Sequence, residues 1–173
     1  MKILKTLLLA LTIVPTSLYA GEIYQKFGVF DYKHDTDAYA LTTKYAQDKN
    51  INFMILGDLK PIYELSFYYD NKNGTRDFQG FAGYLSSGLM KEFNLSKKLF
   101  IAPSFSAGLY QEYDAGKDMG HILEFKSEIE FNYNIFKNSV VGLSWSHISN
   151  ADISTTNPGA DNILFNFRIK ENF

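Results

Sequence analysis

The sequence predicts an all-β protein, an eight-stranded antiparallel β-barrel of the outer membrane. Three observations support this prediction. The chain begins like an exported protein, it contains 15 phenylalanines and 12 tyrosines but no cysteine, and many of its segments alternate apolar and polar side chains. Membrane barrels are rich in aromatic residues, which form girdles at the two membrane interfaces. A chain without disulfides needs another means of stabilisation, and the backbone pairing of a closed barrel supplies it.

Residues 1–20 have the layout of a secretory signal peptide. Two lysines precede an apolar stretch from Leu7 to Val14, and small and polar residues follow as far as Ala20. Cleavage is expected near Gly21, and the sequence defines the signal better than it defines the cleavage site. Residues 21–173 are long enough for one domain, so we expect a single β-barrel domain.

The alternation of side chains has a period of two. From Met119 to Ile135 the odd positions are mostly aromatic or aliphatic, and the even positions are mostly Glu, Lys and Asn. Leu99–Gln111 and Tyr63–Asp70 repeat this pattern. Strands that show one face to lipid and the other to a polar interior have this pattern. A charged row can lie only in water or among paired charges in such an interior.

Eight segments of this kind can be counted, each with about the nine or more residues that a tilted membrane strand needs. Turn-forming residues separate most of them. Side chains fill an eight-stranded barrel, so no pore is expected. The first and fourth segments alternate poorly, and the apolar piece Asn52–Leu56 falls in none of the eight. The expected strands are Ile23–Tyr32, Ala38–Ala46, Leu59–Asp70, Asp77–Lys91, Lys98–Glu112, Met119–Ile135, Ser139–Ser149 and Asp161–Lys170.

A soluble eight-stranded barrel or sandwich is the alternative fold, with its apolar face inward and its polar face outward. The row of Glu and Lys fits either arrangement. The signal peptide, the aromatic content and Phe173, a frequent last residue of outer-membrane barrels, favour the membrane.

The composition also excludes some classes of function. The formal net charge is −2 and the lysines are scattered among acidic residues, so we expect no nucleic-acid partner. His34 and His121 lie far in sequence from His147, and no spacing suggests a set of metal ligands. We therefore expect no metal and no cofactor.

Polar residues interrupt the apolar rows of the last two expected strands. His147 and Ser149 continue the apolar row of the seventh strand, and Asp161 begins that of the eighth. If the two strands pair as a hairpin, these three side chains meet on one outward face. Unpaired polar groups that face lipid are costly, so a cluster of three needs an explanation.

Nucleophilic catalysis is one explanation for this cluster. A serine hydroxyl needs an imidazole to take its proton, and the imidazole needs a carboxylate to hold its tautomer and stabilise its charged form. Ser149, His147 and Asp161 supply this set. Alternatively, His147 and Ser149 lie in the headgroup zone and Asp161 caps a loop. The three residues by themselves leave both explanations open.

Barrel topology places the cluster at the outer leaflet. Outer-membrane barrels keep both termini and the short turns on the periplasmic side, so the connection 150–160 between the last two strands is expected outside. The outer leaflet of such a membrane is lipopolysaccharide, whose acyl chains would lie beside this face.

The run His147-Ile148-Ser149-Asn150-Ala151, followed by Asn157-Pro158-Gly159 and an acid at Asp161, resembles the C-terminal signature of the lipid A 3-O-deacylase (PagL-type) family. The likeness extends more loosely over the mature chain in strand number and order. It implies an eight-stranded outer-membrane barrel that hydrolyses the ester at position 3 of lipid A, the lipid of lipopolysaccharide. It also implies that Ser149 is the nucleophile, His147 the general base and then acid, and Asp161 the orienting carboxylate.

Asn150 and Asn157 also match positions of the family, where an amide could stabilise the oxyanion. They could equally serve loop and turn formation. One departure concerns the acid, because the family usually has Glu where this chain has Asp161. The shorter side chain can orient a histidine only if the backbone brings it close enough.

Two other functions stay open at this point. The chain could be a structural or adhesive barrel without catalysis, or an acyltransferase that moves an acyl chain of lipid A. Basic residues near the outer loops are either contacts for lipid A phosphates or solvated charges. The sequence also leaves open whether the barrel is a monomer or a homodimer. The basic residues in question are Lys33, Lys72, Arg76 and Lys117.

Overall fold

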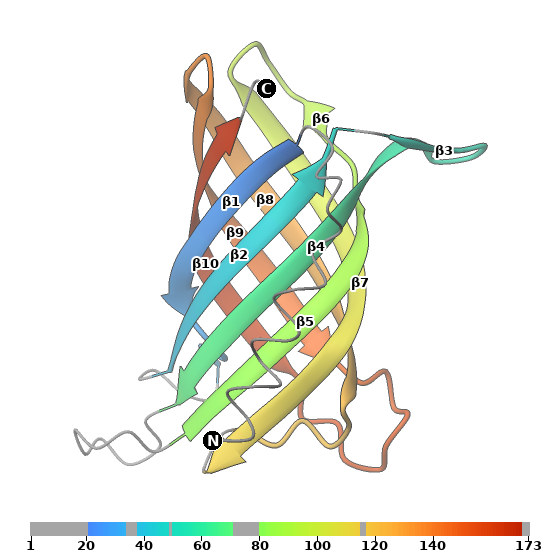
Figure 1. Ribbon diagram of the computed structural model, residues 1–173, viewed down its shortest axis with the longest axis vertical. Coiled ribbons are helices and arrows are strands. Elements are labelled where there is room, and N and C mark those ends of the chain that lie inside the picture. The colour runs from blue at the N-terminus through green and yellow to red at the C-terminus, as the bar shows by residue number, and fades with distance from the viewer. Residues whose placement is uncertain (1–20, 34–37, 49, 71–79, 115–116, 171–173) are drawn as a thin grey trace.

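The structure is a computed structural model that describes residues 21–33, 38–48, 50–70, 80–114 and 117–170. It is an all-strand barrel (Figure 1). None of the described residues forms a helix long and apolar enough to span a membrane. The proposed signal peptide, Phe173, Lys72 and Arg76 lie outside the described residues. The strands are β1 Gly21–Val29, β2 Tyr39–Gln47, β3 Ile51–Phe53, β4 Gly57–Asp70, β5 Gly80–Met90, β6 Phe93–Asn94, β7 Leu99–Asp114, β8 Leu123–Phe136, β9 Ser139–Ser149 and β10 Ala160–Lys170.

Eight of these strands form the wall of the barrel, and β1 pairs with β10 to close it. Every pairing in the wall is antiparallel. The other two strands are short additions, since β3 pairs with β4 and β6 pairs with β7. A closed wall leaves no open sheet edge, as a sheet inside lipid requires. The predicted eight-stranded antiparallel barrel is therefore confirmed.

The predicted strands agree with the observed ones to within a few residues. Ser139–Ser149 is the same in both. The largest difference is at β8, which begins at Leu123 rather than at Met119. Gly120 lies between them with a φ of 81°, a left-handed conformation that a strand does not contain. The unassigned piece Asn52–Leu56 forms most of β3 and the turn that joins it to β4.

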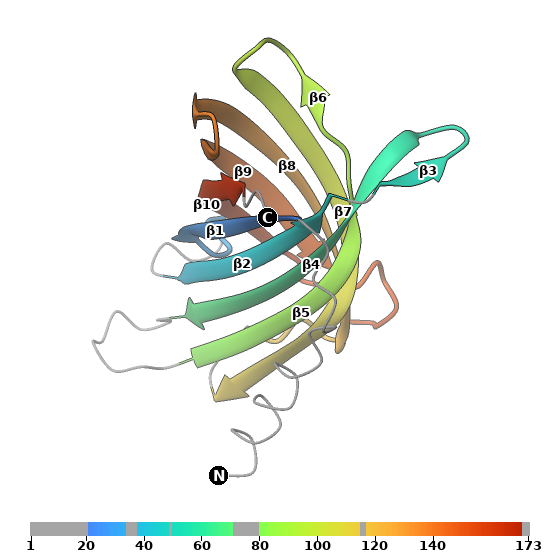
Figure 2. The same ribbon diagram turned by 45° about the horizontal axis from the view of Figure 1, so that its top comes forward.

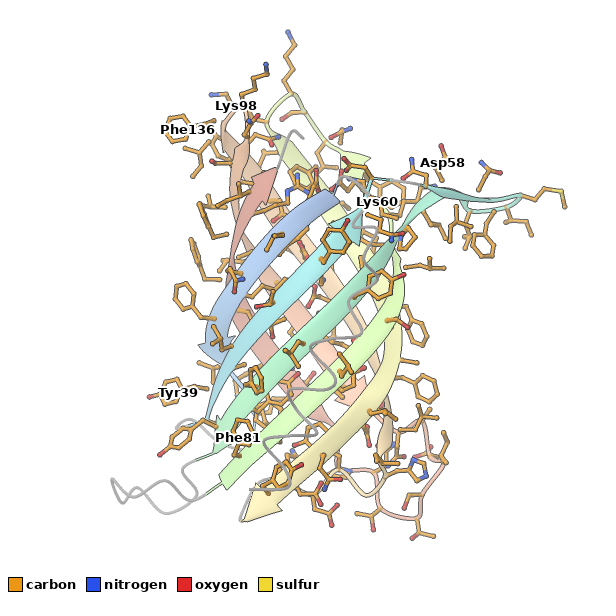
Figure 3. The ribbon with its side chains drawn as sticks, viewed as in Figure 1. Tyr39, Asp58, Lys60, Phe81, Lys98 and Phe136 are labelled. Atoms are coloured by element: carbon orange, nitrogen blue, oxygen red, sulfur yellow. The ribbon has the colours of Figure 1, made fainter. Side chains whose placement is uncertain are left out.

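The apolar rows face outward and the charged rows face inward. Phe27, Leu41 and Phe131 are more than half exposed on the outside of the wall. Figure 3 shows Tyr39 and Phe81 pointing away from the barrel. The soluble alternative requires the opposite arrangement, so the structure excludes it.

Tyrosine pairs lie near the two ends of this outward belt. Tyr39 of β2 stacks on Tyr69 of β4 at one end, and Tyr45 stacks on Tyr63 between the same strands near the other end. Tyr and Trp are enriched where a membrane protein crosses the two interfaces. The two pairs therefore mark the approximate borders of the membrane.

The two ends of the barrel differ in what they carry. Gly21 and the end of β10 lie at the same end as the short turn between β8 and β9, at the top of Figure 1. Strands β1, β4, β7 and β9 finish at the opposite end. Because outer-membrane barrels keep short turns and termini in the periplasm, the top of Figure 1 is periplasmic and the bottom faces outward.

The interior is filled by apolar clusters near the two ends and an ionic layer between them. The outer cluster includes Phe30 and Tyr68, and the periplasmic one includes Tyr24 and Ile62. In the ionic layer every lysine contacts at least one glutamate. Its members are Lys26, Lys44, Lys126, Glu64, Glu128 and Glu130, all buried.

Glu128 is central to the ionic layer. Its carboxylate contacts Lys26 and Lys44 through one oxygen, and its other oxygen lies 3.0 Å from Lys126 Nζ. Lysine and glutamate are present in equal numbers in the layer, so the buried charge is balanced. Removing one partner of a buried ion pair leaves a charge without compensation.

We expect Glu128→Gln to lower the free energy of unfolding by about 3–5 kcal/mol, because it leaves an excess positive charge in the interior. The measurement is the urea midpoint of unfolding in lipid vesicles. The folded fraction is read from gels, on which the folded and unfolded barrels have different mobilities. The exposed-site control Lys97→Gln should leave the midpoint unchanged. Equal midpoints for Glu128→Gln and wild type would contradict the role given to this layer.

Candidate active site

The register of β9 and β10 places His147 directly opposite Asp161 on the outward face. His147 Nδ1 lies 3.2 Å from Asp161 Oδ1. Directly opposed residues of antiparallel strands have Cβ atoms about 5 Å apart, so even the short aspartate side chain reaches the ring. The backbone register thus brings the carboxylate of Asp161 within hydrogen-bonding distance of His147, although the side chain is shorter than that of a glutamate.

Ser149 is the last residue of β9 and follows His147 by two positions. The alternation of a strand therefore puts both side chains on the same outward face. No hydrogen bond joins the Ser149 hydroxyl to His147 within the described part of the chain. Since Nδ1 of the imidazole faces Asp161, Nε2 is the nitrogen left to accept a proton from serine. Hydrogen bonds of this kind are often long without substrate and shorten when it binds.

A second serine lies beside the same imidazole. Ser127 of β8 is directly opposite His147 on the side away from Asp161, and it is exposed. Ser127 cannot be recognised from the sequence, because its partner on the neighbouring strand is 20 positions away and only the register joins them. His147 thus has one hydroxyl along its own strand and another across from it.

Asp161 is held from a second side by Lys33. The ammonium of Lys33, in the segment that follows β1, lies 2.7 Å from Asp161 Oδ2. The hydrogen bond to Asp161 raises the pKa of Lys33 above its ordinary value, so the ammonium is charged at neutral pH and loses its charge only when the pH rises through that raised pKa. The two carboxylate oxygens therefore face different partners, an imidazole and an ammonium.

The segment that carries Lys33 is fixed to β10 by backbone and side-chain bonds. The Tyr32 amide donates to the carbonyl of Asp161 over 2.9 Å, and the Asp31 amide donates to Oδ1 of Asn162 over 3.1 Å. Asp31 has a φ of 51° and its carboxylate pairs with Lys117. Lys33 and Lys117, the two described basic residues of the outer loops, are therefore both in ion pairs.

The asparagines predicted as oxyanion or substrate contacts hold the connection between β9 and β10. Asn150 is buried, and its side-chain amide donates to the carbonyls of Met119 and Thr156 over 2.9 and 2.8 Å. The Asn150 backbone amide donates to Oδ1 of Asn157 over 3.1 Å, and Nδ2 of Asn157 donates to Asp152 over 2.9 Å. Both N–H groups of the Asn150 side chain are thus in use.

Gly159 lies against the ring of His147. A Cβ atom at this position would come 2.9 Å from Cε1 and 3.4 Å from Nε2 of the imidazole. Its φ of 63° is also one that residues with a side chain rarely adopt. The lack of a side chain at Gly159 therefore makes room for the imidazole.

The site lies at the outer end of an apolar row that faces lipid. Trp145 and Ile163 form the next lipid-facing pair after His147 and Asp161, one step toward the membrane centre. Leu143 and Phe165 form the pair after that. All four side chains are exposed. Among the described residues, no group of three or more His, Cys, Asp or Glu side chains is placed to hold a metal ion. The groups available for chemistry are hydroxyl, imidazole, carboxylate and ammonium.

The sequence pattern that defines the lipid A 3-O-deacylase (PagL) family matches residues 51–170, which include His147, Ser149 and Asp161. The chain belongs to this family. Members of the lipid A 3-O-deacylase family are outer-membrane ester hydrolases, and the predictions of family, enzyme class and location are confirmed. No curated protein matches the chain in sequence.

Solved structures support the fold. The outer-membrane enzyme PagL is 17% identical with a TM-score of 0.57, and the match covers 86% of this chain and 98% of that one. Neisserial surface protein A is 11% identical with a TM-score of 0.65, covering 87% and 97%. A designed transmembrane β-barrel is 10% identical with a TM-score of 0.50, covering 88% and 97%. A designed barrel has the same fold as an enzyme, so the fold alone does not show that a protein hydrolyses lipid A.

We expect Gly159→Ala to reduce ester hydrolysis by about 10²-fold, because the added methyl group displaces the imidazole and a misplaced catalytic group costs about that much. Gly83→Ala is the matched control, since a Cβ atom at Gly83 meets no atom within 4 Å. Activity is measured as fatty acid released from purified lipopolysaccharide, after gel mobility has shown that both variants are folded. Equal rates for Gly159→Ala and wild type would show that the added methyl group does not displace the imidazole of His147.

Proposed function

We propose that this protein removes the 3-O-linked hydroxyacyl chain of lipid A, with Ser149 as nucleophile, His147 as general base and acid, and Asp161 as the orienting carboxylate. The observation that carries the proposal is the direct pairing of His147 with Asp161 at the outer end of a lipid-facing row, two residues from Ser149. Membership of the family supports the substrate and the bond that is cut.

The hydrolysis proceeds in two halves, as in other serine esterases. Ser149 Oγ attacks the ester carbonyl while His147 Nε2 takes its proton, and Asp161 stabilises the imidazolium. The tetrahedral intermediate collapses, and the sugar oxygen leaves with the proton from His147. Water then loses a proton to His147 and attacks the acyl-serine. The hydroxy fatty acid leaves, and the proton returns to Ser149.

The position of the site suits an ester at the boundary between sugar and acyl chain. An acyl chain of the outer leaflet can lie along the apolar pairs Trp145–Ile163 and Leu143–Phe165, which continue toward the membrane centre. Its ester end then comes level with His147, at the outer end of the belt. This arrangement accounts for polar catalytic groups on an otherwise apolar face.

The oxyanion of the intermediate needs a hydrogen-bond donor. The side-chain amide of Asn150 already donates to two carbonyls, so we propose that Asn150 acts by holding the loop. Asn157 uses one of its two side-chain N–H groups on Asp152, and the other has no partner among the described residues. Asn157 is therefore the better candidate for the side-chain donor.

Export to the outer membrane supports the further proposal that residues 1–20 are a cleaved signal peptide. Residues 21–173 would then be the mature protein and form one domain.

We expect Ser149→Ala to abolish deacylation, a loss of about 10³-fold or more, while Ser127→Ala keeps it. The measurement is mass spectrometry of lipid A from cells that express each variant at equal surface levels. Loss of one hydroxyacyl chain should occur with wild type and Ser127→Ala only. The reverse result would make Ser127 the nucleophile. Added mass would indicate an acyltransferase, and unchanged lipid A with folded wild type would favour a structural barrel.

Kinetics on purified lipopolysaccharide separate the roles of Asp161 and Lys33. We expect Asp161→Asn to lower kcat by about 10²–10⁴-fold, because the imidazole loses its orienting charge. Lys33→Met should lower kcat only a few-fold at unchanged KM, since a partly exposed ion pair is weak, and Lys33→Arg should restore it. A rise in KM without a change in kcat would instead make Lys33 a contact for the lipid A phosphate.

A further inference from the structure

A short hairpin leaves the barrel wall at the periplasmic end. It consists of β3 (Ile51–Phe53), a turn, and the first residues of β4 from Gly57 to Leu59. Figures 1 and 2 both show it projecting sideways from the wall, whereas the connection between β6 and β7 continues upward along the wall. The hairpin is thus the one described part of the periplasmic rim that extends away from the barrel in the plane of the membrane.

The turn of this hairpin is apolar and exposed. Met54, Ile55 and Leu56 have exposed fractions of 101%, 95% and 56%. Turns normally use Gly, Pro, Asn, Asp or Ser, so three consecutive large apolar residues at a turn are unusual. Ile51 and Phe53 are also exposed. A contiguous exposed apolar patch of this kind marks a surface that binds something apolar.

The paired part of the hairpin has one apolar and one polar face. Ile51 is opposite Leu59 on the apolar face. On the other face Asn52 is opposite Asp58, and its amide donates to the Asp58 carboxylate over 2.7 Å. The two faces therefore suit a boundary between an apolar and an aqueous phase, as the faces of interfacial amphipathic helices do.

A cation lies next to the apolar turn. The ammonium of Lys91, the residue after β5, donates to the carbonyl of Leu56 and lies 5.1 Å from the centre of the Phe93 ring. A lysine that buries its stem against apolar side chains and keeps its charge near the headgroups is typical of membrane interfaces. Lys91 is thus placed to meet phosphate groups of phospholipids.

The level of the hairpin also fits the membrane surface. The Tyr45–Tyr63 pair marks the periplasmic border of the belt, and β4 meets the hairpin at Leu59, four residues beyond Tyr63. Among the described residues β3 pairs only with β4, so its outer edge has unpaired backbone groups. Such an edge is too costly inside hydrocarbon but is tolerated among hydrated headgroups.

We propose that the hairpin of residues 51–59 lies in the phospholipid headgroup region of the inner leaflet of the outer membrane. Its apolar face and the turn 54–56 rest on the acyl chains, and the Asn52–Asp58 face is turned to the periplasm. The exposed apolar patch is then a continuation of the lipid-facing belt, bent into the plane of the membrane. Bound in this way, the hairpin fixes the depth and tilt of the barrel, and so the height of the catalytic site at the opposite surface.

Because the chain contains no cysteine, single cysteines can be placed and spin-labelled without other changes. The full mature chain is folded into phosphatidylethanolamine and phosphatidylglycerol vesicles, and gel mobility shows that each variant is folded. The labels are placed at Ile55→Cys on the turn and at Asn52→Cys on the polar face. Leu143→Cys is the lipid-facing reference and Lys97→Cys the aqueous one. Collisions with oxygen, which concentrates in lipid, are compared with collisions with a water-soluble nickel chelate.

We expect the label at Ile55 to collide more with oxygen than with nickel, as at Leu143, and the label at Asn52 to resemble Lys97. A label at Ile55 that is as accessible to nickel as Lys97 would overturn the proposal, because the hairpin would lie in water. A label shielded from both reagents would also overturn it, since a second copy of the chain would then cover the turn. The measurement does not depend on deacylase activity, so failure of the catalytic proposal would leave it intact.

Discussion

The hydrocarbon core of a membrane offers no partner to a backbone N–H or C=O group. The pairing of β1 with β10 satisfies this constraint, because it turns a sheet with two open edges into a closed wall. Closure then fixes the chemistry of both faces. Outward positions are mostly apolar, and inward positions carry lysines and glutamates that must compensate one another. The alternation in the sequence, with apolar side chains at every second position and charges between them, is the direct result of that closure.

The proposed catalytic arrangement is a product of the same backbone pairing. The hydrogen-bond ladder between β9 and β10 sets His147 opposite Asp161, so no separate structure is needed to orient the imidazole. Polar groups are tolerated on this face because they satisfy one another and lie at its outer end, near the headgroups. The loops add the remaining constraints. Lys33 forms an ion pair with the second oxygen of Asp161, and Gly159 leaves space for the imidazole of His147.

The sequence was sufficient for most of the fold and for placing the three candidate residues on one face. Alternation is a local property, so together with the turn residues between segments it located all eight strands of the wall, although two of them alternate poorly. It missed β3, because a three-residue strand with an apolar turn has too few positions to show a period. The residues missed at the site were missed for another reason. Ser127 and Lys33 approach His147 and Asp161 from positions distant in sequence, and no local pattern encodes such a distance.

By itself, the amino-acid sequence determined the fold class and the face that meets lipid, and it predicted three candidate residues for ester hydrolysis, because these depend on residue type and on a repeat of two along one strand. Only the tertiary structure decided what each of those residues contacts. It paired Asp161 with both His147 and Lys33, gave Asn150 to the loop, and turned the 51–59 hairpin away from the wall. These outcomes depend on register and on loop geometry, which many residues fix together.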